Sequence, residues 1–444
     1  MKVLLIYPGK AFIYSQSEYL ATRGYANYTT PSLALLIIGK MCSEKWDVQY
    51  LDERFEEIDF ESDADIIGLT AMTPQAVRAY EIADTFRKKG KYVVMGGIHA
   101  TVMPDEAKQH VDSVFIGEAE RTWPQFMIDY GKSQTKDIYR APIPGIIDLQ
   151  TVSVLPYYEL LDNKFWNTTW WPLQISRGCP HNCNYCLTPV KDGNRIRRKT
   201  QDQVIKEIEY IKQIKPNRTK IGFSDDNMCT NKGITKSLLR EILARKIEFT
   251  WATQTDISIG EDVELLALMR ETGCTTAIVG LESLVSESLS SFDPKYQWKR
   301  KMLDKYSVLI DKIQSYGIKV SAALIVGFDS DDSSVFDRIA DFYISHNIIM
   351  PQVAILTPYP GTGIREMMIN SDKILRDIPW SYYGGFDVVY KPNKMNASEI
   401  VLGVEHIYKR VLSPDQIINR LKYFKTKIGR STKSKTTGQL STVE

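Results

Sequence analysis

The chain of 444 residues lacks a long hydrophobic run, a strong net charge and an abundance of cysteine. Its apolar stretches, of which residues 2–8 are typical, are too short for a membrane span or a secretory signal. The formal net charge of +2 gives no reason to expect nucleic acid or an anionic membrane as a partner. Only six cysteines and no signal sequence indicate a reducing compartment, where thiols stay available for metal. We therefore expect a soluble, cytoplasmic protein that is long enough for two or three domains.

Three of the six cysteines are concentrated in one short stretch. Cys179, Cys183 and Cys186 have the spacing C-x3-C-x2-C, and their soft thiolates suit an iron–sulfur cluster or zinc. Three thiolates on one loop favour a cubane cluster with one iron left open, because structural zinc usually draws on two separated ligand pairs. A zinc site that includes His181 is the alternative. The remaining cysteines are expected as small buried residues: Cys42, Cys229 and Cys274.

An aromatic residue, Tyr185, stands directly before the third cysteine. With it, the stretch resembles the cluster loop of the radical S-adenosylmethionine (SAM) enzymes. The resemblance implies a [4Fe–4S] cluster on Cys179, Cys183 and Cys186. It also implies that the open iron binds the amino and carboxylate groups of SAM and that Tyr185 lies near the adenine.

Residues 1–130 alternate short apolar strands with helical stretches. Strands are expected at residues 3–7, 48–51, 66–69, 93–95 and 114–116, and helices at 32–43 and 74–89. This alternation predicts a parallel, doubly wound, flavodoxin-like or Rossmann-like sheet, whose ligands bind at the carboxyl ends of the strands. The loops expected there carry glycines, which let the backbone approach a ligand, and threonine hydroxyls.

A doubly wound domain, a linker and then a C-x3-C-x2-C loop together resemble the cobalamin-binding branch of the radical SAM superfamily. Five stretches carry this resemblance, which covers roughly residues 1–365: 31–36, 51–53, 68–70, 96–99 and 116–118. The resemblance implies cobalamin contacts in the strand-end loops, at Thr70, Thr73, Gly96, Gly97, His99, Gly117 and Glu118.

The chain departs from the cobalamin proteins that hold cobalt with an axial histidine in a D-x-H-x-x-G stretch. The corresponding stretch here is Asp52–Glu57, which has neither that His nor that Gly. We therefore expect cobalamin to bind without this ligand. His99 is the alternative nearby, although we favour a hydrogen-bonding role in a loop for it.

From about residue 170 the alternation of strands and helices starts again. Strands are expected at residues 173–175, 221–223, 249–252, 277–280, 320–326 and 352–356, with helices at 201–214, 236–245, 263–272, 302–316 and 334–345. Six such units predict a partial (β/α)6 barrel with its chemistry at the carboxyl strand ends. Polar residues there are the expected SAM contacts, although each alone could be a helix cap: Ser224, Asp225, Asp226, Asn227, Gln254, Glu282 and Ser283. The resemblance places the contact to the SAM amino group in residues 224–227 and the contact to the ribose at Glu282.

These patterns divide the chain into five parts. Residues 1–135 are the expected cobalamin-binding domain, 136–168 a proline-containing linker and 169–362 the radical SAM barrel. Trp166, Trp170 and Trp171 are expected to wall a cofactor or to be buried between domains. Residues 363–424, with an aromatic loop at 380–386, are expected to form a small, mostly helical region that either caps the barrel or completes its core. Residues 425–444 are rich in Lys, Thr, Ser and Gly and are predicted to be disordered.

The resemblance predicts a cobalamin-dependent radical SAM methyltransferase that acts on an unactivated carbon. It implies that a 5′-deoxyadenosyl radical from SAM abstracts a substrate hydrogen and that methylcobalamin supplies the methyl group. A cyclisation or rearrangement without methyl transfer is the main alternative, and a non-catalytic corrinoid and iron–sulfur protein is a third. A tRNA methylthiotransferase would need three further cysteines in its first domain, which has only Cys42. The expected partners are a small-molecule, lipid or peptide substrate and an electron donor of flavodoxin or ferredoxin type, with no nucleic acid.

Overall fold

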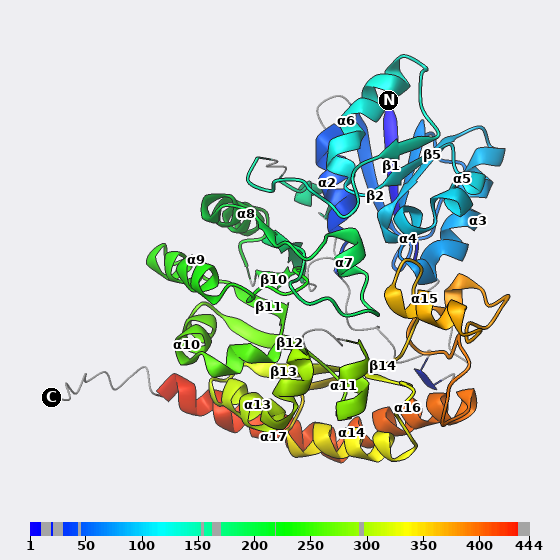
Figure 1. Ribbon diagram of the computed structural model, residues 1–444. Helices are drawn as coiled ribbons and strands as arrows, with labels where there is room; N and C mark the ends of the chain where they lie inside the picture. The colour runs from blue at the N-terminus through cyan, green and yellow to red at the C-terminus, as the bar shows by residue number, and fades with distance from the viewer. Residues whose placement is uncertain are drawn as a thin grey trace. The chain divides into compact units, whose positions relative to one another are not determined.

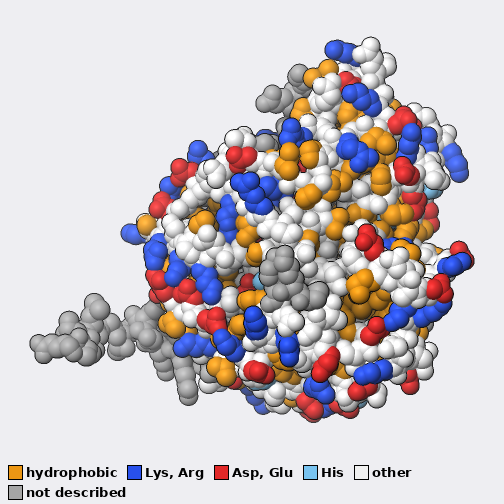
Figure 2. All heavy atoms as spheres, in the orientation of Figure 1, with side chains coloured by type: hydrophobic (Ala, Val, Ile, Leu, Met, Phe, Trp, Pro, Cys, Tyr) orange, Lys and Arg blue, Asp and Glu red, His pale blue; other side chains and the backbone are white. Residues whose placement is uncertain are grey.

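A computed structural model gives the fold of the chain (Figure 1) and describes residues 1–9, 19–20, 30–42, 46–151, 155–161, 170–217, 219–292 and 297–433. The chain packs as two compact units. One is Met1–Asp226 with Ile355–Pro392, and the other is Asn227–Ala354 with the chain from Asn393 onward. Among the described helices, none combines the length and apolarity that a membrane span needs. Acidic and basic side chains are interspersed over the face drawn in Figure 2, in keeping with the small net charge.

The first unit contains a parallel six-stranded sheet with the strand order β2-β1-β3-β4-β5-β6. Its strands are β1 Lys2–Tyr7, β2 Asp47–Asp52, β3 Ile66–Thr70, β4 Tyr92–Gly96, β5 Ser113–Ile116 and β6 Ile138–Arg140. The helical elements between them are α2 Leu33–Cys42, η1 Thr73–Gln75, α3 Ala76–Lys88, α4 Gly97–Val102, α5 Pro104–His110 and α6 Ala119–Gly131. Thr70 is paired with Gly96, so β3 and β4 end side by side.

Helices cover both faces of this sheet because successive strand residues point to opposite sides. Leu4 and Ile6 of β1 belong to a core that is closed by α3, α4 and α5. Val3 and Leu5 belong to a second core that is closed by α2 and α6. The domain is therefore a doubly wound, three-layered α/β structure (Figure 1).

The rest of the first unit contains the strands and helices around the three clustered cysteines. Its elements are η2 Tyr158–Leu161, β7 Trp171–Leu173, β8 Ser176–Arg177, α7 Thr188–Lys191, β9 Arg197–Arg198, α8 Gln201–Ile214, β10 Lys220–Phe223, α15 Gly363–Asn370 and η6 Trp380–Tyr382. Strand β7 pairs in parallel with β10, and the short strands β8 and β9 pair antiparallel. Thr200 begins α8 by accepting a hydrogen bond from the amide of Gln203, in a capping box.

The second unit contains the strand order β14-β13-β12-β11, in which β11, β12 and β13 are parallel. The strands are β11 Thr250–Thr255, β12 Cys274–Glu282, β13 Lys319–Val326 and β14 Met350–Ile355. The helical elements are α9 Lys232–Ala244, η4 Ile257–Glu261, α10 Val263–Glu271, α11 Ser286–Phe292, α12 Trp298–Met302, η5 Leu303–Lys305, α13 Tyr306–Ser315, α14 Ser334–Ser345, α16 Ala397–Val411 and α17 Pro414–Lys433. Strand residues with alternating burial in β12 and β13 form the middle of this core.

The predicted fold class is confirmed. A doubly wound domain comes first, and β7 and β10–β14 then alternate with helices, as in a partial (β/α)6 barrel, before the helices α16 and α17. The predicted helices at residues 201–214 and 334–345 have the bounds of α8 and α14.

Three details of the predicted secondary structure were wrong. The first barrel strand ends at Leu173, because the amide of Ile175 bonds to the carboxylate of Asp225 rather than to a neighbouring strand. The segment after Gly96 is not a loop, because α4 begins at Gly97. Residues 425–433 continue α17, which the buried Phe424 anchors. Residues 434–444 and Trp166 lie outside the described residues.

Candidate functional site

The three clustered cysteines lie on residues 178–196, which we call the cysteine loop. The paired strands β8 and β9 close its base, and α7 follows the third cysteine. Cys183 is buried, whereas Cys179 and Cys186 are partly exposed. Within the loop, the amide of Cys186 donates to the carbonyl of Cys183 over 3.0 Å. The fold therefore brings all three thiols into one short irregular segment of the first unit.

Asp225, which follows β10, fixes the start of the cysteine loop. Its side chain is buried, with Oδ2 accepting from the amide of Ile175 over 3.0 Å. Its Oδ1 accepts from the amide of Ser176 over 2.6 Å and from the Ser176 hydroxyl over 2.5 Å. Burial raises the pKa of Asp225 to about 6, although the three hydrogen bonds oppose this shift. Both carboxylate oxygens of this predicted SAM contact are thus engaged by the chain itself.

Asp226 holds the same loop at two further points. Its Oδ1 accepts from the hydroxyl of Thr188 over 2.9 Å, and its Oδ2 accepts from the amide of Gly178 over 3.3 Å. Thr188 also donates its amide to the sulfur of Cys186 over 3.4 Å. A hydrogen bond to sulfur stabilises a thiolate and tunes a cluster bound to it. The Asp225–Asp226 pair therefore fixes the loop on both sides of the cysteines.

The other predicted SAM residues of this segment have different surroundings. Ser224 is exposed, and its amide donates to the carbonyl of Leu173. Asn227, in the second unit, is buried and donates to Oδ2 of Asp256 over 2.8 Å. Gln254 has an exposed side chain on β11. Ser224 and Gln254 are thus accessible to a ligand, whereas the side chain of Asn227 is bonded to Asp256.

Glu282, at the end of β12, is held by a lysine that is distant in sequence. Its Oε1 accepts from Nζ of Lys299 over 2.7 Å, and the same Nζ donates to the carbonyl of Gly280 over 2.5 Å. Glu282 has a φ of 71°, which is uncommon for a residue with a side chain. Its neighbour Ser283 is buried and accepts from the amide of Val285. An uncommon backbone conformation at a charged strand end is a feature of ligand sites.

The donor set of the cysteine loop fits an iron–sulfur cluster. Among the described residues, no group of three or more His, Cys, Asp or Glu side chains converges on one metal position. A cubane spreads its thiolate ligands over different irons, so those ligands need not converge on one point. The other three cysteines are buried apart from the loop, as predicted, and burial raises the pKa of Cys42 to about 12.

The predicted cobalamin residues lie at the carboxyl ends of β3, β4 and β5, in residues 70–73, 96–97 and 117–118, which we call the strand-end segments. The hydroxyl of Thr101 joins two of them, since it donates to the carbonyl of Gly97 over 2.9 Å and accepts from the amide of Gly117 over 3.1 Å. Thr101 thus links Gly97 and Gly117, which are 20 residues apart in the sequence.

A narrow cavity of about 60 Å³ reaches from these segments to the core beneath α2 and α6. Its walls are mostly apolar and include Gly68, Thr70, Gly96 and Gly97. A side chain at Gly68 would not fit without a shift, because a Cβ there would lie 2.7 Å from Leu5 Cδ2. Bare glycine backbone at the strand ends lets a ligand approach closely, which fits cobalamin, whereas the cavity itself is smaller than the aromatic base of that cofactor.

Arg54 occupies the position at which the D-x-H-x-x-G proteins have their histidine. Its guanidinium donates to both carboxylate oxygens of the buried Asp52, with Nε to Oδ1 over 2.8 Å and Nη2 to Oδ2 over 2.6 Å. It also lies over the rings of Tyr7 and Phe55, at 4.7 and 5.4 Å from their centroids. A guanidinium has no lone pair to offer a metal, so this position cannot supply an axial ligand.

His99 is fully buried in α4 and is hydrogen-bonded there. Its Nε2 lies 2.9 Å from the hydroxyl of Tyr80, and its Nδ1 lies 3.5 Å from the hydroxyl of Thr73. Its Nε2 is also 3.9 Å from Glu106, whose Oε1 accepts from the indole nitrogen of Trp380 over 2.7 Å. The favoured hydrogen-bonding role therefore agrees with the structure, although the residue is in a helix and not in a loop.

Glu118, a predicted cobalamin contact, is bonded to two arginines and a backbone amide. Its Oε1 accepts from Arg177 over 2.8 Å and from Arg197 over 2.6 Å, and its Oε2 accepts from the amide of Ile147 over 2.9 Å. These donors together keep the pKa of Glu118 low, although burial alone would raise it. Glu120 also forms an ion pair with Arg177.

Sequence reasoning missed Arg54, Lys299 and the arginines that flank the cysteine loop. For Arg54 the signal was available, since it stands in the third position of Asp52-x-Arg54, where the axial histidine was sought. For Lys299 no local signal exists, because it is 17 residues from its partner Glu282.

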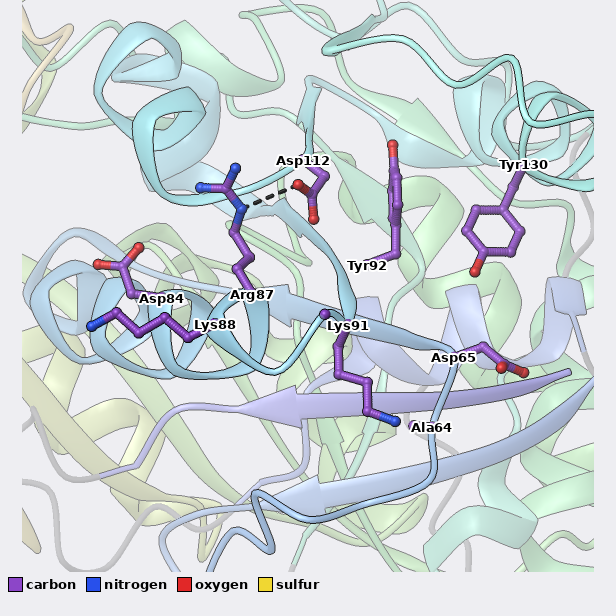
Figure 3. Close-up of a pocket in the computed structure, with 10 residues that line it drawn as sticks. Ala64, Asp65, Asp84, Arg87, Lys88, Lys91, Tyr92, Asp112 and Tyr130 are labelled. Carbon is purple, nitrogen blue, oxygen red and sulfur yellow. Dashed lines mark hydrogen bonds and ion pairs between the residues drawn. The ribbon is translucent and has the colours of Figure 1, made fainter.

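A larger hollow lies elsewhere on the first domain (Figure 3). It has a volume of about 800 Å³ and is lined by residues that precede β3, β4 and β5, such as Asp65 and Lys91. Arg87 and Asp112 on its wall form an ion pair of 3.1 Å (Figure 3). Ligands of doubly wound sheets bind at the carboxyl strand ends, and this hollow lies at the amino ends, so we do not assign it to a cofactor.

Comparisons with known proteins agree with this arrangement. The Radical SAM superfamily model matches residues 173–343, and the B12 binding domain model matches residues 19–126. The bacteriochlorophyllide d C-8(2)-methyltransferase of Chlorobaculum tepidum is 27% identical over 403 residues, which cover 88% of this chain and 87% of the relative. The hopanoid C-2 methylase of Rhodopseudomonas palustris is 24% identical over 390 residues, which cover 85% of this chain and 71% of the relative.

A solved structure has the same fold over most of the chain. The radical S-adenosylmethionine methyltransferase TsrM from Kitasatospora setae, with cobalamin and a [4Fe-4S] cluster bound, has a TM-score of 0.68 and 15% identity, covering 93% of this chain and 89% of TsrM. The two family models occur in the predicted order, and the named relatives span most of the sequence. The chain therefore combines a B12 binding domain with a radical SAM domain, and these findings support a cobalamin-dependent radical SAM methyltransferase with a [4Fe–4S] cluster, SAM and cobalamin as cofactors.

Proposed function

We propose that this enzyme methylates an unactivated carbon of a large, apolar substrate. The observation that carries this proposal is the length of the match to relatives that are named as methyltransferases of a bacteriochlorophyllide and of a hopanoid. A carbon with no acidity and no nucleophilicity cannot attack SAM directly, which is why a second cofactor is needed. When bound, the cluster with SAM supplies a hydrogen-abstracting radical, and cobalamin supplies the methyl group.

The residues of this chain hold and orient these groups. We assign Cys179, Cys183 and Cys186 to the cluster, and Tyr185 and Glu282 to SAM. Asp225 and Asp226 hold the chain before and after the cysteines, at Ser176, Gly178 and Thr188, so that the three thiols between these points stay close together for a cluster.

The cobalamin site is assigned to the strand-end segments within residues 1–135. Glycine there lets the backbone approach the corrin, and Thr70 and Thr73 offer hydroxyl groups for hydrogen bonds. A domain of residues 169–362 then carries the cluster and SAM, and a flavodoxin-like or ferredoxin-like protein supplies the electron in a reducing compartment.

The decisive experiment uses the anaerobically reconstituted chain with methyl-labelled SAM, hydroxocobalamin, dithionite and a lipid extract of the host. We expect 5′-deoxyadenosine together with label in an apolar product. Formation of 5′-deoxyadenosine without label in any product would indicate cyclisation or rearrangement instead. Absence of 5′-deoxyadenosine from a fully cluster-loaded protein, with and without extract, would indicate a non-catalytic carrier.

Substitution of Glu282 is predicted to weaken SAM binding without affecting the cluster. Glu282→Gln keeps an acceptor for Lys299 but removes a charge-assisted hydrogen bond to the ribose. Such a bond contributes about 1.5–3 kcal/mol, which corresponds to a roughly ten- to hundredfold loss of affinity. Equilibrium SAM binding and iron content measure this, with Glu287→Gln on the following helix as the control. Unchanged SAM affinity would show that the ribose contact lies elsewhere.

Cobalamin is predicted to bind without a nitrogen ligand from the protein. Arg54 stands where a histidine would be needed, and His99 is buried against Tyr80. We also expect the cofactor's own base to be displaced. The paramagnetic resonance spectrum of the reduced, cob(II)alamin form should then show no superhyperfine splitting from nitrogen, in the natural chain and in His99→Ala alike. Splitting that disappears in His99→Ala would contradict this prediction while keeping the cofactor. Failure to retain any corrinoid would remove cobalamin from the proposal.

A further inference from the structure

A buried group of opposite charges joins the first domain to the cysteine loop. Glu118 and Glu120 follow β5, while Arg177 and Arg197 belong to the paired strands β8 and β9. Arg177 bonds to both glutamates, and Arg197 shares Oε1 of Glu118 and lies 3.4 Å from Asp192. All of these side chains belong to the first compact unit. We call these five residues the charge network.

The charge network is shielded from solvent. The side chains of Arg177 and Arg197 are 13% and 10% exposed, and that of Glu118 is 7% exposed. The chain passes close to Glu118 at Gly145, where a Cβ would lie 2.5 Å from the Glu118 carboxyl carbon and 2.9 Å from Nη2 of Arg197. Buried ion pairs are strong only where all partners and hydrogen bonds are in place, so this packing makes the position of Glu118 sensitive to the arginines.

The network touches both proposed cofactor sites through the backbone. Glu118 directly follows Gly117, whose amide is bonded to Thr101 in the strand-end segments. Arg177 is two residues before Cys179, and the amide of the intervening Gly178 is bonded to Asp226. A shift of the cysteine loop at Arg177 would therefore displace the side chain of Glu118 and, with it, the adjacent backbone of Gly117.

We propose that Glu118 is a positioning residue that couples the cysteine loop to the strand-end segments, and not a direct cobalamin contact. Ordering of the cysteine loop by a cluster fixes Arg177 and Arg197, and these fix Glu118 and the Gly117 backbone. Cobalamin then binds to a backbone that is already ordered and loses less conformational entropy on binding. The cluster therefore strengthens cobalamin binding. By linkage, cobalamin strengthens cluster retention by the same factor. This inference rests on the proposed cobalamin and cluster sites.

The experiment measures the dissociation constant of hydroxocobalamin for the full chain, by absorbance, with the cluster reconstituted and after iron has been removed with a chelator. For the natural chain we expect binding to be at least about fivefold tighter with the cluster, the lower end of usual coupling. In Glu118→Gln this ratio should fall to about one, because the neutral amide cannot hold both arginines. In Glu118→Asp, which keeps the charge, part of the ratio should return.

Matched controls separate coupling from simple loss of structure. Glu61→Gln removes an exposed ion pair with Lys89 in the same domain and should leave the ratio unchanged. If Glu118→Gln does not fold, Arg177→Lys, which keeps the charge but loses the planar fork, replaces it. The inference would be overturned if the natural chain bound cobalamin equally well with and without the cluster. It would also be overturned if the Glu118 variants weakened both dissociation constants equally and left their ratio unchanged. If no form binds cobalamin although the cluster is intact, the proposed cobalamin site itself fails.

Discussion

Replacement of Cys183 by Ala is expected to abolish the cluster and to bring SAM cleavage to background. Cys183 is the most buried of the three thiols and lies at the centre of a loop that Asp225 and Asp226 hold from both sides. Two remaining thiolates cannot hold a cubane whose fourth iron must stay open for SAM. Iron should therefore fall from about four per chain to near zero, and 5′-deoxyadenosine should no longer form.

The same chain provides the control for this prediction. Cys42→Ala removes a buried thiol whose sulfur donates to the carbonyls of Ile38 and Gly39 in its own helix, apart from the cysteine loop. We expect it to keep its iron and its SAM cleavage. Retained SAM cleavage in Cys183→Ala would remove the assignment of the cluster to this loop.

Replacement of Asp225 by Ala is expected to destabilise the chain and to lower its iron content together. The variant leaves the amides of Ile175 and Ser176 and the Ser176 hydroxyl without their buried acceptor. Each lost partner costs about 1–3 kcal/mol, and the relief of a buried carboxylate offsets part of the sum, so a net loss of about 2–4 kcal/mol is expected. Urea unfolding of the iron-free chain measures it.

Ser224→Ala, one residue away, is the matched control for this variant. Ser224 is exposed, and its hydroxyl lies 3.4 Å from the carbonyl of Gly222, so its loss should change stability by about 0.5 kcal/mol or less. If Asp225→Ala were as stable and as rich in iron as Ser224→Ala, Asp225 would not hold the loop. If Asp225→Ala lost only SAM binding, Asp225 would instead be a direct SAM contact, as predicted from the sequence.

Local patterns predicted the elements of the fold well. Buried strands such as residues 66–70 and the amphipathic helix at 201–214 carry their periodicity within a few residues, so their type could be predicted directly. The error at residues 173–175 has a different origin. The amides of Ile175 and Ser176 are satisfied by a side chain 50 and 49 residues away, and this interaction leaves no trace in the local pattern.

The candidate site shows the same division. The spacing of Cys179, Cys183 and Cys186 indicates cluster chemistry because all three ligands come from one segment. Polar residues at strand ends indicate that these ends form a polar surface, but they do not show whether a given side chain contacts a ligand or another part of the chain. Asp225 and Glu118 are both charged strand-end residues, yet each is occupied by partners from a distant segment. Their use could not be predicted without the long-range geometry.

The first compact unit consists of two separate stretches of the chain, Met1–Asp226 and Ile355–Pro392. The indole of Trp380, in the second stretch, donates to Glu106 in the first domain over 2.7 Å, and Arg365 lies over the ring of Trp380. During synthesis from the amino terminus, the interval 227–354 must therefore be translated before the unit can close. At the usual rate of about 5–20 residues per second, translation of this interval takes about 6–26 seconds. During that time a nascent chain has Glu106 without the indole of Trp380, so the surface around this carboxylate is covered only after the second stretch has been made.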